Sequence, residues 1–127
     1  MQISKVQRWA GIALTGLTGL FLLADAVMKL FKPRVVVEGT VSLGYPESTI
    51  IGMGLALLAS AILYLIPRTA VLGAVLLTGY LGAAVATHVR VCDTWFNTLF
   101  PVLFGSVLWC GIWLRDERLR RLLPIVR

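Results

Sequence analysis

The sequence predicts an all-α integral membrane protein, an antiparallel up-down bundle of four helices that forms one domain over residues 1–127. Three observations support this fold class. Hydrophobic residues make up 58% of the chain and charged residues 14%, against about 45–50% and about 25% in soluble domains, and so short a chain cannot bury that much apolar surface. Four apolar runs approach the roughly 20 residues that cross a bilayer as a helix. Basic residues flank these runs, as they do in membrane proteins.

The first predicted helix covers about residues 9–31. No charge occurs from Trp9 until Asp25, and Pro33 disfavours continuation of the helix. The alternative is a signal peptide cleaved near Ala26. Apolar residues continue beyond that point, which favours a complete span.

The second and third helices are predicted at about residues 49–66 and 69–89. Neither apolar run contains a charge before His88, and the dipeptide Pro67-Arg68 between them indicates a tight antiparallel hairpin. The long connection at 34–47 mixes β-branched residues with two glycines. We expect a short interfacial segment there, helical or extended.

The fourth helix is predicted at about residues 97–114, with Asn97 or Thr98 as its N-cap and Pro101 in its first turn. A basic tail at 115–127 contains five arginines. The aromatic residues within 94–96, just before the fourth helix, are expected at the membrane interface.

The distribution of Lys and Arg predicts the orientation of the chain. Eight of them fall at the N-terminus, in the turn at 67–68 and in the tail, whereas four fall on the other side. The positive-inside rule then places both termini in the cytoplasm of a bacterial inner (plasma) membrane protein. The net charge of +6 is thus assigned to contact with the lipid bilayer, and no nucleic acid partner is expected.

Polar residues of the first and third helices should meet inside the bundle. The two helices run in the same direction, and lipid-facing polar groups are costly. We therefore predict a ligand-binding site toward the outer side, with Thr15 and Thr18 lining the interior below it and Glu47 near its outer edge. The candidate ligand-binding residues are Asp25, Lys29, Tyr80, Thr87 and His88.

Structural roles fit the same residues. Asp25 and Lys29 have the spacing of an ion pair along one helix face. A single histidine near a helix end is commonly a hydrogen-bonding residue, and Tyr80 fits helix packing. The small-residue ridge of Gly52, Ala56 and Ser60 fits close contact between helices, either within the bundle or in a homodimer.

The sequence contains no recognisable catalytic motif. No Cys, His or carboxylate spacing indicates a metal site, and a single histidine excludes a bis-His haem site. Cys92 and Cys110 form no CxxC pair and are expected near opposite membrane faces, too far apart to bridge. No catalytic residue can be named, and a non-enzymatic role is favoured.

Three stretches carry a family resemblance: FLLADAVMKLF in the first helix, GYPES before the second, and LYLIPRTAVLGAVLLTGYLGAAVATHVR across the hairpin. With four spans, they make the chain resemble the bacterial DoxX-like family over nearly its whole length. The positions typical of the family pattern are Asp25, Lys29, Tyr45, Pro46, Tyr80, Thr87, His88 and Arg90.

The resemblance implies a four-helix membrane bundle with no agreed catalytic residue. The family takes its name from a small subunit associated with a thiosulfate:quinone oxidoreductase and terminal oxidase. Relatives are linked to membrane redox complexes, and distant eukaryotic relatives act as assembly chaperones for membrane receptors.

Three roles follow as hypotheses. The first is an accessory or ligand-binding subunit of a membrane redox system, which holds a quinone or other lipophilic small molecule through His88 and Asp25 and needs no other cofactor. The second is a non-catalytic chaperone or scaffold that binds the helices of other membrane proteins. The third is a small transporter, which the absence of a charge deep in any helix disfavours.

Overall fold

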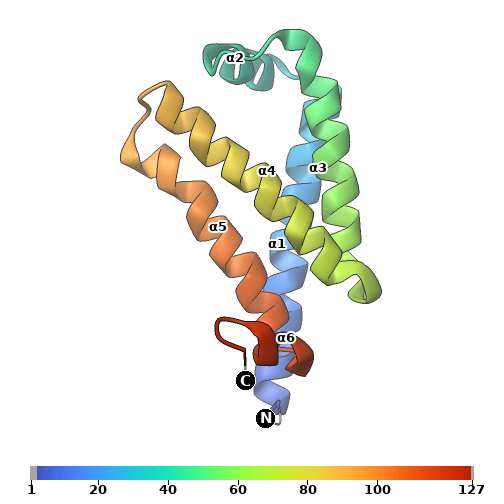
Figure 1. Cartoon of the computed structure of the whole chain (residues 1–127). Helices are drawn as coiled ribbons and strands as arrows, with labels where there is room; N and C mark the ends of the chain where they lie inside the picture. The colour runs from blue at the N-terminus through green and yellow to red at the C-terminus, as the bar shows by residue number, and fades with distance from the viewer. Residues whose placement is uncertain (1–2, 127) are drawn as a thin grey trace.

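The computed structural model describes residues 3–126, which are helical almost throughout and include no strand. Figure 1 shows the order of the elements along the chain. They are α1 (Lys5–Phe31), α2 (Arg34–Ser42), the 3-10 turn η1 (Glu47–Thr49), α3 (Ile50–Leu65), the 3-10 turn η2 (Pro67–Thr69), α4 (Ala70–Arg90), α5 (Trp95–Trp113) and α6 (Glu117–Leu122).

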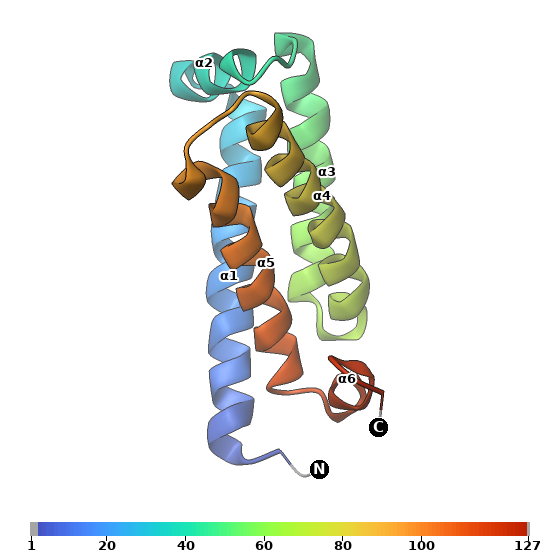
Figure 2. The ribbon, with the colours of Figure 1, turned by 60° about the vertical axis from the view of Figure 1, so that its left-hand side comes forward.

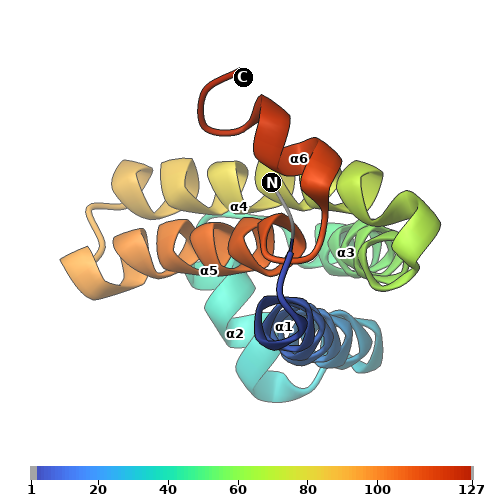
Figure 3. The ribbon, with the colours of Figure 1, turned by 90° about the horizontal axis from the view of Figure 1, so that it is seen from below.

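Four of the helices, α1, α3, α4 and α5, are long and apolar enough to cross a membrane, and this confirms the predicted spans. Each packs against two others: α1 and α4 both contact α3 and α5. α1 and α4, which run in the same direction, are therefore diagonal to each other (Figure 3). Both described ends of the chain lie at the same end of the bundle (Figure 2).

The bundle is packed most tightly in the half near the chain ends. Tyr64 of α3 is fully buried, and its hydroxyl donates a hydrogen bond of 2.6 Å to the carbonyl oxygen of Leu108 in α5. A Cβ on Gly11 would lie 2.6 Å from the carbonyl oxygen of Gly111. Small residues thus allow α1 and α5 to approach closely, as is usual for membrane helices.

The other half of the bundle is more open. α2 lies across this end of the bundle, and α4 and α5 lean away from α1 and α3 as they approach it (Figure 1). The predicted connection at 34–47 is therefore a helix followed by a turn. This geometry leaves space inside the bundle beneath α2.

Two predicted helix starts are wrong. The first helix begins at Lys5, because Ser4 and Gln7 form a capping box upstream of Trp9. The fourth begins at Trp95, because the hydroxyl of Thr94 accepts the amide hydrogen of Asn97 at 3.2 Å.

The choice of cap also changes the position of Pro101. It lies inside α5 and not in its first turn, so the predicted cap at Asn97 or Thr98 does not form. The interfacial aromatic residues that were expected to precede the helix instead occupy its first turn, where Trp95 and Phe96 are exposed.

The predicted basic tail contains a short helix, α6, with Arg120 buried at its centre. The guanidinium of Arg120 donates hydrogen bonds to the carbonyl oxygens of Trp113 and Leu114 at the end of α5. Both cysteines are free, as predicted, and both are exposed.

Candidate functional site

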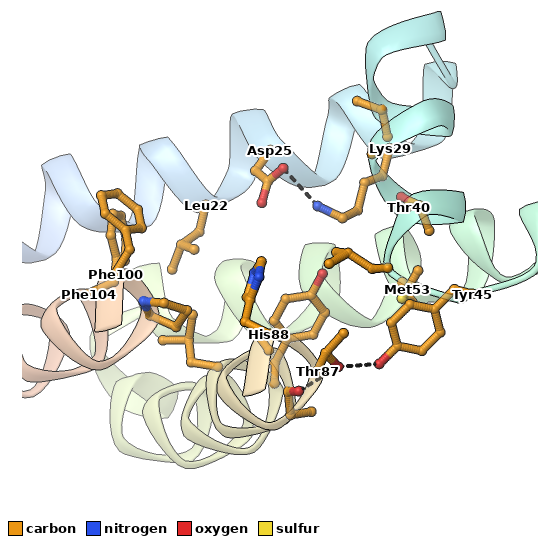
Figure 4. Close-up of a pocket in the computed structure, with 18 of the residues that line it drawn as sticks. Leu22, Asp25, Lys29, Thr40, Tyr45, Met53, Thr87, His88, Phe100 and Phe104 are labelled. Atoms are coloured by element: carbon orange, nitrogen blue, oxygen red, sulfur yellow. Dashed lines mark hydrogen bonds and ion pairs between the residues drawn. The ribbon is translucent and has the colours of Figure 1, made fainter. Parts of the chain in front are cut away.

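A cavity of about 540 Å³ lies in the open half of the bundle, between α1, α2, α4 and α5. All five candidate residues, Asp25, Lys29, Tyr80, Thr87 and His88, line it. Figure 4 shows them with their neighbours. The volume is within the range of about 300–1,000 Å³ that is typical of small-molecule sites.

One polar wall belongs to α1. Nζ of Lys29 donates to Oδ1 of Asp25 at 2.8 Å, and the two residues are one helical turn apart. The side chain of Lys29 is 15% exposed and that of Asp25 is 40% exposed. The ammonium group has three hydrogens, so it retains donors for another acceptor in the cavity.

A second polar wall is formed where α4 ends. Nδ1 of His88 donates to Oδ2 of Asp93 at 2.8 Å. The helix closes with a Schellman motif: Cys92 has φ 55°, and the amide of Asp93 donates back to the carbonyl oxygen of His88. This turn places the Asp93 carboxylate beside the imidazole.

The Asp93 carboxylate is held by several donors. The Thr94 amide donates to Oδ1 at 2.7 Å and the Asn97 side chain donates at 3.1 Å. The Thr94 amide first, and then the His88 and Asn97 side chains, hold the pKa of Asp93 below its ordinary value of 3.8.

An ionised carboxylate can only accept hydrogen bonds, so Nδ1 of His88 is the donor in this pair. Among the described residues, no hydrogen bond partner engages Nε2. The cavity therefore presents a free ring nitrogen of His88 on α4 as well as the Lys29 donor on α1.

The turn after α2 is joined to α4 by two hydrogen bonds. The hydroxyl of Thr87 donates to the carbonyl oxygen of Ala83, so it accepts the hydroxyl of Tyr45 at 2.7 Å. Arg90 donates to the carbonyl oxygen of Leu43 at 2.6 Å.

Glycine suits the turn after α2. Gly44 has φ +94°, and a Cβ there would lie 2.8 Å from Nη2 of Arg90. The resulting turn presents Tyr45 to α4 and holds α2 over the cavity.

The remainder of the lining is largely apolar. The rings of Phe21 and Phe104 lie 5.0 Å apart, and those of Phe100 and Phe104 lie 5.8 Å apart. Phe21 is 55% exposed and Phe100 is 41% exposed. Because α1 and α5 are membrane spans, the exposed aromatic side of the cavity between them faces the surrounding lipid.

Thr15 and Thr18 are buried inside the bundle, as predicted, and they do not line the cavity itself. Glu47 pairs with Lys32 at 3.4 Å, also off the cavity.

Sequence reasoning missed Tyr45 as part of the lining and Asp93 as the partner of His88. Only the occurrence of a carboxylate and a tyrosine just beyond helix ends could have indicated them. In residues 3–126, no group of three or more His, Cys, Asp or Glu side chains is arranged to hold a metal ion.

The comparisons with known proteins agree with the fold. No curated protein and no solved structure matches the chain. The model of the DoxX-like family matches residues 13–111, which contain the four spans almost completely and every candidate residue. The chain is a multi-pass membrane protein that belongs to the DoxX-like family.

Proposed function

We propose that the protein binds a lipophilic small molecule of the quinone class in the cavity beneath α2. The observation that carries the proposal is the division of the lining: charged and polar groups from α1 and α4 face an aromatic wall that is open toward lipid. Such a cavity suits a flat polar ring with an apolar tail.

The polar groups match the chemistry of a quinone and its reduced form. Lys29 supplies a donor for a carbonyl oxygen, and Nε2 of His88 is free to form a hydrogen bond with a second oxygen of the ring. The Phe21 and Phe104 rings offer faces and edges for contact with an aromatic head group.

We further propose that the protein acts as an accessory subunit of a membrane redox system in the bacterial inner membrane. The match to the DoxX-like family supports this role, because the resemblance implies a link with membrane redox complexes. The chain would then hold or deliver the quinone while a partner protein performs electron transfer.

The scaffold role is favoured by one observation. Gly52 and Ala56 are exposed on α3, so part of the small-residue ridge is not used inside the bundle. A scaffold would need this ridge and would not need the cavity, so variants of the cavity separate the two roles.

Gly39 allows the cavity to be filled without damage to the bundle. It lies on the face of α2 that lines the cavity, and a Cβ there would meet no atom within 4 Å. Gly39→Leu therefore adds side-chain volume at the site. Gly79→Leu is the matched control, because Gly79 is also helical and free of close neighbours but does not line the cavity.

The test is equilibrium binding of a short-chain benzoquinone with a decyl tail to the full-length protein in mild detergent. We expect Gly39→Leu to weaken binding at least about tenfold, a loss of about 1.4 kcal/mol, and Gly79→Leu to bind as the wild type does. Absence of quinone binding by the wild type, or equal binding by both variants, would contradict the proposal.

A further inference from the structure

A second cavity, of about 750 Å³, lies at the opposite end of the bundle. Figure 3 views this end directly. Residues from the start of α1, from η2 and the start of α4, and from α6 surround it. It shares no residue with the cavity beneath α2, so what it binds does not depend on the proposed quinone site.

Positive charge dominates the lining of this second cavity. Four arginines, Arg8, Arg68, Arg115 and Arg118, line it together with two carboxylates, Asp116 and Glu117. Arginine is the side chain that best matches the geometry of phosphate and carboxylate groups.

Arg115 is incompletely satisfied by the protein. Its Nε is the one buried side-chain nitrogen or oxygen without a hydrogen bond partner in residues 3–126. Burial of a donor without a partner is unfavourable, and an acceptor bound in the cavity beside this guanidinium would reduce that cost. Among residues 3–126, the side chains of Arg8 and Arg68 have no ion pair and no hydrogen bond.

Arg120 shows what a structural arginine looks like at this end. It is 4% exposed, donates to two backbone carbonyl oxygens, and lies 4.4 Å from the centre of the Trp113 ring. The cavity arginines have no such set of contacts.

The carboxylates do not neutralise the cavity. Oδ1 of Asp116 accepts the amides of Arg118 and Leu119 as the N-cap of α6, and the same oxygen lies 3.5 Å from Nε of Arg118. Glu117 is exposed at the start of α6. Arg8, Arg68 and Arg115 therefore remain available to an anion.

Exposed apolar side chains adjoin the arginines. Ile12, Val71 and Leu122 line the same cavity and are 42%, 40% and 58% exposed. A soluble phosphate would gain nothing from them, whereas the acyl chains of a lipid would bury them favourably.

We propose that this cavity binds the phosphate of an anionic phospholipid, with Arg68 and Arg115 on the head group and Ile12 and Val71 along the acyl chains. Basic pockets between membrane helices bind anionic head groups in this way. The site fixes the end of the bundle formed by α6 and the start of α1 against one leaflet.

The test is native mass spectrometry of the full-length protein in detergent, with phosphatidylglycerol or phosphatidylcholine of the same acyl chains. Arg68→Gln removes an exposed guanidinium from the cavity, and Arg115→Gln removes the partly buried guanidinium whose Nε has no partner. Arg34→Gln is the matched control, because it removes the same charge from an exposed side chain at the opposite end.

We expect the wild type and Arg34→Gln to bind phosphatidylglycerol in preference to phosphatidylcholine, and the double variant Arg68→Gln/Arg115→Gln to lose that preference about tenfold. If Arg115→Gln does not fold, as judged by circular dichroism, the exposed pair Arg8→Gln/Arg68→Gln takes its place. Equal loss in Arg34→Gln, or no loss in either cavity variant, would overturn the proposal.

A competition with glycerol 3-phosphate separates a lipid from a soluble phosphate. We expect phosphatidylglycerol to remain bound in a large excess of glycerol 3-phosphate, because the acyl chains add apolar contacts. Complete displacement would assign the cavity to a soluble phosphate compound and overturn the lipid proposal.

Discussion

The hydroxyl of Tyr45 donates a hydrogen bond of 2.7 Å to the hydroxyl oxygen of Thr87, 42 residues farther along the chain. Together with the contact from Arg90 to the Leu43 carbonyl oxygen, it fastens the turn after α2 to the end of α4. The cover of the cavity is thus tied to the same helix that supplies His88. Opening this cover requires both contacts to break.

Tyr45→Phe should loosen the cover. It removes one neutral hydrogen bond, which contributes about 0.5–1.5 kcal/mol, while the ring stays in place. We expect faster hydrogen exchange in α2 and a small decrease in melting temperature. Exchange measured by mass spectrometry checks this, and unchanged exchange in residues 34–45 would show that the hydrogen bond does not hold α2.

Asp93 makes part of the stability dependent on pH. Its pKa is held below its ordinary value of 3.8 by the Thr94 amide, His88 and Asn97. A lowered pKa in the folded state stabilises the fold above the unfolded-state pKa, and this stability is lost as the pH falls through the folded-state pKa.

The melting temperatures of the wild type and Asp93→Asn, measured against pH, test this prediction. We expect the wild type to be more stable near neutral pH, and the difference to shrink as the pH falls below 3.8. A difference that grows as the pH falls would contradict the assignment.

Two glycines of α4 should respond oppositely to alanine. A Cβ on Gly73 would overlap the backbone of Tyr64 in α3, whereas a Cβ on Gly82 would meet nothing within 4 Å. Gly73→Ala should therefore destabilise the protein severely. Gly82→Ala should stabilise it by about 0.5–1 kcal/mol through the helix propensity of alanine. Melting temperatures in detergent check both, and a tolerated Gly73→Ala would show that α3 and α4 are not in contact there.

The charge distribution predicts the topology. Both described chain ends lie at one end of the bundle, where most of the basic residues gather. A reporter that is active only in the periplasm should stay silent at the C-terminus and should be active when inserted near Glu38. The reverse pattern would show that the bundle has the opposite orientation in the membrane.

The spans and the polar faces of α1 and α4 could be predicted from the sequence, because helical periodicity alone places Asp25, Lys29 and His88 on interior faces. Their convergence also follows from the direction of the two helices. What periodicity does not contain is the leaning apart of α4 and α5, which opens the cavity beneath α2.

The place of Tyr45 at the cavity and of Asp93 beside His88 could not be predicted from the sequence, for a different reason. Tyr45 and Asp93 both follow turns with a residue at positive φ, and the direction of each side chain depends on that turn. Gly44 is a common residue for such a turn, but Cys92 is not. The cap at Thr94 was missed because Trp95 and Phe96 look like interfacial residues, although lipid also accepts them in a first helical turn.

The most direct measurement of ligand binding compares wild type and His88→Ala, with the co-purified lipophile and the melting temperature determined on the same sample. We expect the wild type to retain a lipophile and His88→Ala to lose it. The ligand-free melting temperature should change little, because Asp93 keeps its contacts with Thr94 and Asn97. A His88→Ala protein that melts much earlier but retains as much lipophile as the wild type would contradict the binding site and make His88 a structural residue.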